Sequence, residues 1–212
     1  RILIDLDGSN NKSRLGANAI LGVSLAVARA GSLYKNSNLF YYLNKRSEYI
    51  LPTPLMNIIN GGAHANNALD FQEIMIMPVG AETFSEALRW GAEIFQELKK
   101  ILSDKGYSTS VGDEGGFSPE IKNVYDALSL VSKAIKKAGR NPEDEVKLAI
   151  DAASSEFFKN GIYIIDNGDR TLDTSEMIKY WETLINDYPI ISIEDPLDEN
   201  DFEGYCQLTD LL

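Results

Sequence analysis

Cysteine and basic residues are both scarce in this sequence. The single cysteine among 212 residues, Cys206, cannot form an internal disulfide, so a disulfide-stabilised fold is excluded and a reducing cytoplasm is the expected location. The 20 Lys and Arg residues stand against 32 Asp and Glu, which gives a formal net charge of −12. Because nucleic acids and anionic membranes bind clustered Lys and Arg, we expect neither as a partner.

Long apolar runs are also missing. The most apolar stretch, residues 15–28, has only 14 residues and contains Asn18 and Ser24. A membrane-spanning helix needs about 20 residues, so we predict no membrane span and no signal peptide, but a buried core helix over residues 13–30. The sequence starts at Arg1 and ends without a capping Gly or Pro, so we expect it to be part of a longer protein.

Residues 47–54 are the best candidate for a domain boundary. Pro52 and Pro54 interrupt the chain in an extended stretch, which is typical of a linker. With 44% apolar and 25% charged residues, the composition is that of a globular protein. We therefore predict two domains, residues 1–46 and residues 47–212.

The second predicted domain reads as an α/β fold. Two apolar runs, residues 55–59 and 71–77, are close enough in sequence to pair as a hairpin with a wide loop. Strands and helices then alternate, which is typical of a parallel sheet, open or closed into a barrel. The predicted strands are residues 108–112, 146–150 and 190–193, the predicted helices start at Thr83, Ser118 and Ser175, and a surface hairpin is expected over residues 163–172.

Three acidic residues, Glu114, Asp151 and Glu194, each follow a predicted strand. They are 37 and 43 residues apart, about one strand–helix unit each. Because equivalent ends of parallel strands lie at one rim, these carboxylates should converge, and a divalent cation such as Mg²⁺ would relieve their repulsion. The alternative is that each acid merely caps the helix that follows it.

The wide hairpin loop and the strand after it supply further candidates. His64 is the only histidine and follows the flexible pair Gly61 and Gly62, although a lone loop histidine is more often structural. Glu73 is a charged residue within an apolar run, so we expect it to have an interaction partner or a functional role. Strand alternation puts Gln72 and Glu73 on opposite faces, unless the strand is irregular there.

Several motifs together resemble enolases, the glycolytic 2-phosphoglycerate hydro-lyases, and are nearer to bacterial than to animal members. They occur in enolase order over nearly the whole chain, at residues 13–24 (SRLGANAILGVS), 60–65 (NGGAHA), 72–73 (QE), 111–117 (VGDEGGF), 151–158 (DAASSEFF) and 192–197 (SIEDPL). The resemblance implies an enolase-type modified TIM barrel that starts with an antiparallel hairpin. It would be incomplete here and preceded by helices of a small α+β N-terminal domain.

The resemblance also implies roles for individual residues. Asp151 and Glu194 would bind the catalytic Mg²⁺, and Glu194 would also lie against the substrate. Glu114 would be the general acid, with Glu73 as its acidic neighbour. His64 and Gln72 would contact the substrate, a small phosphorylated three-carbon acid, and His64 and Glu73 would take part in catalysis. The activity would be the reversible dehydration of 2-phospho-D-glycerate to phosphoenolpyruvate.

Other expected parts of an enolase find no match in residues 1–212. These are the lysine base, the third metal carboxylate, the Arg-Ser phosphate-binding segment and the N-terminal loop that supplies a serine, so the isolated chain is expected to be inactive. Enolases are homodimers, in some bacteria octamers, and are also known from the cell surface and as secreted proteins. Two alternatives stay open: an acid-sugar dehydratase or racemase of the same superfamily, and a non-catalytic chain with a binding or structural role.

Overall fold

The computed structural model describes residues 1–44, 46, 48–112 and 114–212; Lys45, Ser47 and Asp113 lie outside the described residues. The chain forms two compact units, Arg1–Leu51 and Pro52–Leu212. The division lies within the residues 47–54 that the two prolines single out as a boundary. Each unit is described below by itself.

The first unit consists of helices α1 (Ile2–Asp7), α2 (Ala17–Tyr34) and α3 (Leu39–Leu43). The predicted helix over residues 13–30 exists, but it begins at Ala17 because Gly16 has a φ of 81°. Its predicted burial is wrong: Ser32 is the one buried residue reported for α2, while Leu21 and Val27 are more than half exposed. Two short helices, of six and five residues, cannot cover all sides of an 18-residue helix.

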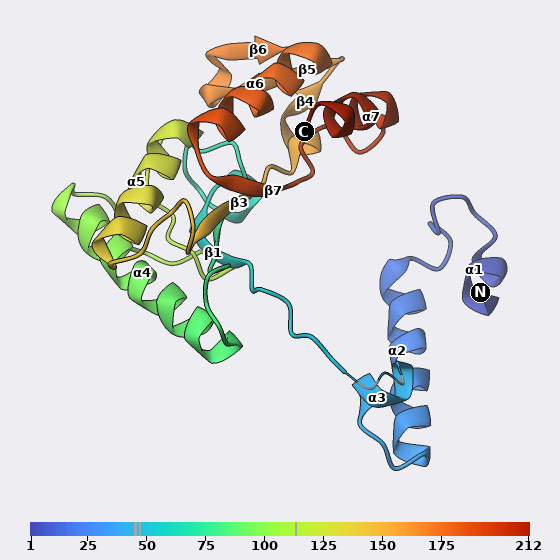
Figure 1. The fold of residues 1–212 in the computed structure, drawn as a ribbon. Helices are drawn as coiled ribbons and strands as arrows, with labels where there is room; N and C mark the ends of the chain where they lie inside the picture. Colours follow the sequence, from blue (N-terminus) through green and yellow to red (C-terminus); the bar gives the residue numbers. More distant parts are fainter. Residues whose placement is uncertain (45, 47, 113) are drawn as a thin grey trace. The chain divides into compact units, whose positions relative to one another are not determined.

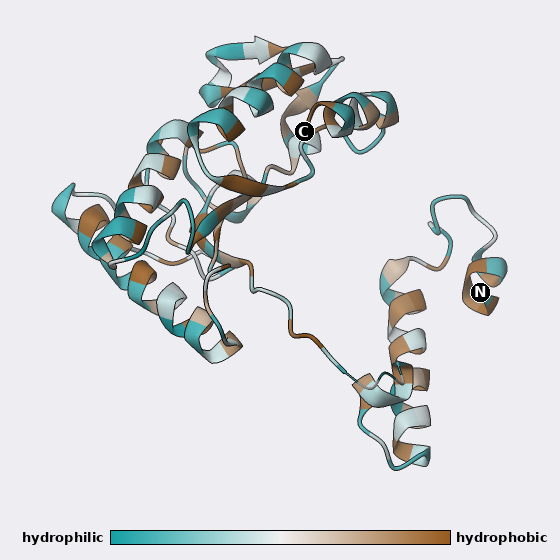
Figure 2. Ribbon diagram, viewed as in Figure 1, coloured by the Kyte–Doolittle hydropathy of each residue, from teal (hydrophilic) through white to brown (hydrophobic). Residues whose placement is uncertain are grey.

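The same helix is the one among the described residues that is long and apolar enough to cross a membrane by length and composition. This is weak evidence, because core helices of soluble proteins and N-terminal signal sequences meet the same criteria. Figure 2 shows the apolar residues of α2 spread along its length.

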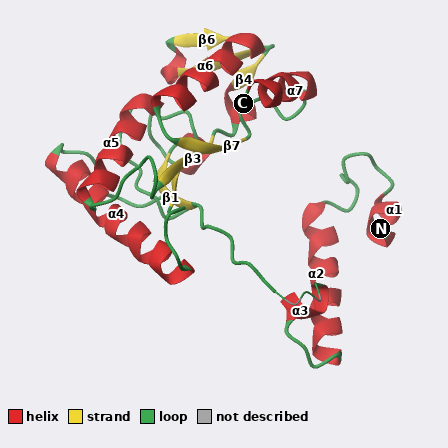
Figure 3. Cartoon of the chain, viewed as in Figure 1, coloured by secondary structure: helices red, strands yellow, loops and turns green. Residues whose placement is uncertain are grey.

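A four-stranded sheet forms the centre of the second unit (Figure 3). Its strands are β1 (Met56–Asn60), β2 (Glu73–Met77), β3 (Lys147–Asp151) and β7 (Ile190–Glu194), in the order β1-β2-β3-β7. The β1–β2 and β2–β3 pairs are antiparallel and the β3–β7 pair is parallel. The predicted hairpin and the strands at 146–150 and 190–193 are confirmed; the described residues form an open sheet and no closed barrel.

The strand predicted over residues 108–112 is wrong. Val111 makes only an isolated bridge with Phe117, which also bridges Ile59. The amide of Gly112 donates to the carbonyl of Gly116, so the chain turns back on itself here and adds no strand to the sheet. Glu114 therefore lies in a loop.

Four long helices accompany the sheet: α4 (Phe84–Asp104), α5 (Val124–Lys137), α6 (Thr174–Asp187) and α7 (Phe202–Leu211). Figure 1 shows α4 and α5 lying side by side. Thr83 caps α4 as predicted, but α5 begins at Val124 and not at Ser118, because the Asn123 side chain accepts a bond from the amide of Asp126 and caps it there.

A smaller antiparallel sheet packs beside α6, with strands β4 (Phe158–Lys159), β5 (Ile162–Ile165) and β6 (Arg170–Leu172). The turn between β5 and β6 contains the short helix η3 (Asp166–Gly168), where Asn167 has a left-handed φ of 58°. The predicted surface hairpin is thus confirmed. Two further short helices, η1 (Gly62–His64) and η2 (Ser154–Phe157), lie in the loops after β1 and β3.

The core of the second unit is aliphatic and aromatic. Side chains of β2 and β3 such as Ile74 and Ile150 are fully buried together with Leu98 of α4 and Leu128 of α5. Trp181 of α6 is also fully buried, and its indole nitrogen donates to the carbonyl of Pro196 at 2.9 Å. This bond ties α6 to the loop that follows β7, directly after the acidic end of that strand.

Candidate active site

Four polar residues form a row across one edge of the sheet. Asn60 is the register partner of Glu73, Glu73 is that of Asp151, and Asp151 is that of Glu194. Because β2 runs antiparallel to its neighbours, its first residue lies beside the last residues of β1 and β3. Directly opposed residues of neighbouring strands point to the same face. The topology thus brings three carboxylates together on one face of the sheet.

Asp151 disfavours the charge of both of its carboxylate neighbours in the row. Burial, followed by the charge of Asp151, raises the pKa of Glu73. Burial also raises the pKa of Asp151, while the charge of Asp151 is the main cause of the raised pKa of Glu194. The row is therefore a concentration of negative charge that the neighbouring protein groups compensate only in part.

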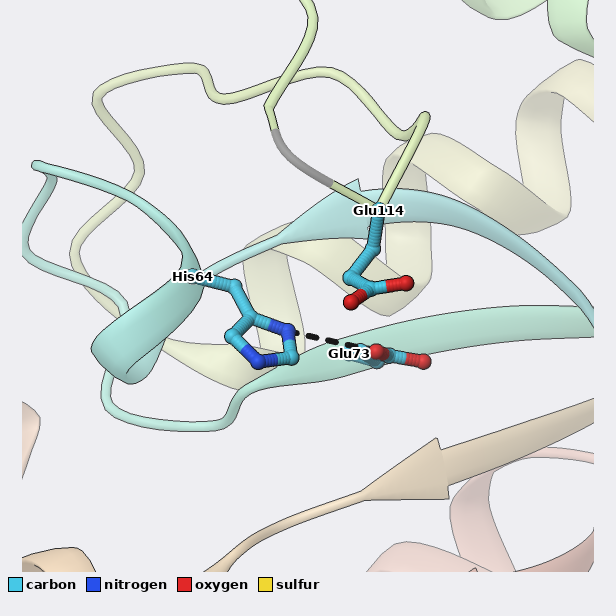
Figure 4. Close-up of side chains that lie close together, drawn as sticks. All are labelled: His64, Glu73 and Glu114. Atoms are coloured by element: carbon cyan, nitrogen blue, oxygen red, sulfur yellow. Dashed lines mark ion pairs between the residues drawn. The ribbon is translucent and has the colours of Figure 1, made fainter. Parts of the chain in front are cut away.

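A second group of side chains meets the row at Glu73. Ligand atoms of His64, Glu73 and Glu114 all lie within 4.8 Å of one another. His64 comes from η1 and Glu114 from the loop after residue 112, and both reach toward Glu73 (Figure 4). His64 Nδ1 lies 3.3 Å from Glu73 Oε1, without the alignment of a hydrogen bond. Glu114 is exposed, whereas His64 and Glu73 are half-buried.

Gln72 also reaches the site, although simple alternation puts it on the face opposite Glu73. Its Nε2 donates to Asp151 Oδ2 at 3.1 Å. Gln72 lies in a bend just before β2 begins, so strand alternation does not apply to it. The other oxygen of Asp151, Oδ1, accepts from the amide of Ala153 at 3.1 Å. The Asp151 carboxylate is therefore held in orientation by two donors.

The capping alternative for the three predicted acids is wrong. Helices α5, α6 and α7 are capped by Asn123, Asp173 and Asp201, whose side chains each accept a backbone amide of the first turn. The side chains of Glu114, Asp151 and Glu194 therefore do not cap these helices and are free to bind a ligand. Asp113, which the sequence places beside Glu114, lies outside the described residues.

The donor set of the row suits a hard divalent cation. Glu73, Asp151 and Glu194 offer carboxylate oxygens only, which Mg²⁺ prefers. Because the charge of Asp151 raises the pKa of both Glu73 and Glu194, a positive charge among the three carboxylates would relieve repulsion. Asp151 and Glu194, paired on neighbouring parallel strands, are the residues of the row that would hold a Mg²⁺ ion. Among the described residues, the three ligand groups that lie within 4.8 Å of one another are those of His64, Glu73 and Glu114.

Two residues of the candidate site, Asn60 and Asn67, are not among those predicted from the sequence. Asn60 is fully buried at the end of β1, and its Nδ2 donates to the carbonyl of Gly116 at 2.8 Å. Asn67, in the loop that carries His64, bonds to carbonyls of two other segments. The sequence signal for Asn60 was a polar amide residue directly after an apolar run. No local pattern marks Asn67, whose partners are distant in sequence.

Both parts of the chain match known protein families. A family model described as the enolase C-terminal TIM barrel domain matches residues 48–212. A second model, described as the enolase N-terminal domain, matches residues 1–43. The first match covers well over half of the chain and contains all six predicted site residues, His64, Gln72, Glu73, Glu114, Asp151 and Glu194.

Proposed function

Because this chain belongs to the enolase family, we propose that the protein containing it is a Mg²⁺-dependent lyase that reversibly dehydrates 2-phospho-D-glycerate to phosphoenolpyruvate. The single observation that carries the proposal is the row of Glu73, Asp151 and Glu194 in adjacent register, with His64 and Glu114 meeting it at Glu73. Such a site suits a substrate whose own negative charge grows during the reaction.

Each residue has a task in this reaction. Asp151 and Glu194 would hold the cation, and Gln72 keeps the Asp151 carboxylate oriented by its hydrogen bond. When bound, Mg²⁺ would stabilise the negative charge that develops on the substrate carboxylate after loss of the proton beside it. Glu114 donates a proton to the departing hydroxyl group, and His64 and Glu73 orient that group.

Glu73 is suited to share a proton with its acidic neighbour. Its pKa is raised by burial, by Asp151 and by Glu114, whereas His64 lowers it. A carboxyl group that retains a proton more readily than usual can pass it to a partner and stabilise the pair. This supports Glu73 and Glu114 as an acid pair at the site of hydroxide departure.

A substrate panel tests the proposal directly. The full-length protein that contains residues 1–212 should form phosphoenolpyruvate from 2-phosphoglycerate, and only with Mg²⁺ present. Preference for acid sugars would instead assign it to another branch of the superfamily. Absence of turnover on either class, in a folded protein, would favour a binding or structural role.

The metal assignment has its own test. Asp151→Ala should abolish measurable Mg²⁺ binding in calorimetry while the circular dichroism spectrum stays unchanged, because the side chain lies at the edge of the sheet and not in its core. Glu182→Gln, which removes an exposed acid on α6, serves as the control and should bind Mg²⁺ as the parent protein does. Unchanged Mg²⁺ affinity in the Asp151 variant would refute the assignment.

A further inference from the structure

One side chain, that of Asn67, connects three separate segments around the candidate site. Its Nδ2 donates to the carbonyl of Asn60 at 2.9 Å and to that of Pro119 at 2.9 Å. Its Oδ1 accepts from the amide of Leu69 at 3.3 Å. Both amide hydrogens and the carbonyl oxygen of this half-buried side chain are therefore in use.

Each of the three segments brings a residue to the site. Asn67 and Leu69 lie in the loop that carries His64, three residues before Asn67. Asn60 ends β1 and is the register partner of Glu73. Pro119 lies five residues after Glu114, in the same irregular segment before α5. This segment and the His64 loop reach Glu73 from different parts of the chain (Figure 4).

The chemistry of the junction requires a neutral side chain with two donors. Two backbone carbonyls face one short side chain, and only an amide supplies two N–H groups at that length without a charge. Aspartate has the same shape but would place a carboxylate against two carbonyl oxygens. Alanine would leave the His64 loop without its bonds to Asn60 and Pro119.

We propose that Asn67 is a positioning residue that holds the His64 loop in register with the Glu114 loop and with the first residue of β2. The proposal rests on the function proposed above, because it assigns Asn67 to the same site. Asn67 does not touch the reacting groups; it acts through His64 and Glu114. Asp70 adds a second connection for the loop by accepting from the amide of Asn167 at 3.3 Å.

Variants at position 67 test the proposal in the full-length protein. Asn67→Ala and Asn67→Asp should lower kcat/KM for 2-phosphoglycerate by ~10²-fold, the loss expected from misplacing catalytic groups by about 1 Å. Asn67→Ser keeps one donor and should give an intermediate value. The neighbouring Asn66→Ala is the matched control, because Asn66 is exposed and forms no side-chain hydrogen bond reported among the described residues.

A readout independent of turnover separates this proposal from the proposed function. His64 is the only histidine, so modification of the protein by diethylpyrocarbonate at histidine reports on His64 alone. The His64 side chain is 29% exposed, and a loop released by Asn67→Asp should raise its modification rate toward that of a fully exposed histidine, by about threefold if the rate follows exposure. If the parent protein does not turn over 2-phosphoglycerate, this rate still tests the position of the loop.

Two results would overturn the role of Asn67. One is a His64 modification rate in Asn67→Ala and Asn67→Asp that equals the rate in the parent protein. The other is the same change in these two variants and in Asn66→Ala, which would show general loosening of the loop. Since Asn67→Asp keeps the parent size and Asn67→Ser keeps a hydrogen-bond donor, a failure of Asn67→Ala to fold leaves the test intact.

Discussion

Glu114 reaches the site from a loop, and this placement decides how its role can be tested. The side chain is exposed, and one of its carboxylate oxygens lies within 4.8 Å of ligand atoms of Glu73 and His64. The loop is anchored close by, since the carbonyl of Gly116 accepts from Asn60 and the amide of Phe117 donates to Ile58 at 3.0 Å. The loop thus presents an exposed acid group next to backbone that β1 holds in place.

Glu114→Gln should separate the two halves of the dehydration. Glutamine keeps the shape but cannot give a proton to the departing hydroxide, so dehydration should fall by ~10²–10⁴. Exchange of the substrate's alpha proton with solvent should continue, because a different base removes it. Turnover and isotope exchange are measured on the same full-length protein. Dehydration near the parent rate would show that Glu114 is structural and would direct the search to Glu73.

Gly116 should be intolerant of any side chain. A Cβ at this position would lie 2.8 Å from the carbonyl carbon of Ile58 and 2.9 Å from the amide nitrogen of Ile59. Backbone atoms of a buried strand cannot move aside cheaply, so Gly116→Ala should cost about 1–3 kcal/mol in the free energy of unfolding. Urea denaturation measures this cost. Gly22→Ala on α2, where nothing lies within 4 Å, is the control and should not destabilise.

At the scale of elements, the antiparallel direction of β2 is what assembles the acidic row. A parallel β2 would place its last residue, Met77, at this edge, and Glu73 would lie at the opposite edge. The register pairs Glu73 with Asp151, and the parallel β3–β7 pair adds Glu194. The row therefore depends on strand direction as much as on the residues themselves.

This row should make stability depend on pH in the absence of divalent cations. The folded state raises the pKa of Glu73, Asp151 and Glu194, so it binds protons that the unfolded chain has already released. The free energy of unfolding should therefore fall as the pH rises from about 4 through the raised pKa values, and recover as the pH falls. Urea titrations across this range measure it.

A variant of the row and the addition of Mg²⁺ each test whether the row causes this pH dependence. Asp151→Asn should flatten the dependence and stabilise the cation-free protein at neutral pH, whereas Glu182→Gln should leave the slope as it is. Adding Mg²⁺ at neutral pH should raise the free energy of unfolding of the parent protein but not of Asp151→Asn. An equal slope in the parent and Asp151→Asn would assign the pH dependence to other groups.

At the scale of the whole molecule, the sheet of the described residues ends in two edge strands, of which β1 is bridged by Phe117 and β7 has an open side. Among the described residues β7 pairs with β3 alone, and Ile191 on it is 51% exposed. A hollow of about 710 Å³ lies along β7 and is lined mainly by apolar side chains, among them Ile185, Ile193 and Leu208, with Glu194 and Asp195 at one end. Such an edge is able to pair with another chain.

The 212-residue chain alone should therefore self-associate through β7. Ile191→Lys should reduce this association, because a charge on an edge strand disfavours pairing with a second copy. The matched control is Ile162→Lys on β5, a strand that is paired on both sides and should not affect association. Light scattering at rising concentration measures the effect. A parent chain that stays monomeric with a cooperative melt would contradict this expectation.

Local patterns were sufficient for most elements of the second unit. Alternation and apolar runs predicted β1, β2, β3 and β7, and the turn residues Asn167 and Gly168 predicted the β5–β6 hairpin. These features depend on neighbours within a few residues, which the sequence shows directly. The prediction of a strand over residues 108–112 is wrong because a strand also needs a partner for its backbone groups, which local patterns do not show; here the amide of Gly112 bonds to the carbonyl of Gly116 instead.

The sequence by itself determined which residue types are available for chemistry: one histidine and a set of acids placed after apolar runs. Only the tertiary structure decided that Gln72 and Glu73 both approach Asp151, that other residues cap the helices, and that Asn60 and Asn67 hold the loops of the site. The physical reason is distance along the chain. Asn67 and Pro119 are 52 residues apart and Gln72 and Asp151 are 79 apart, so their contacts arise from strand direction and register, which no local pattern contains.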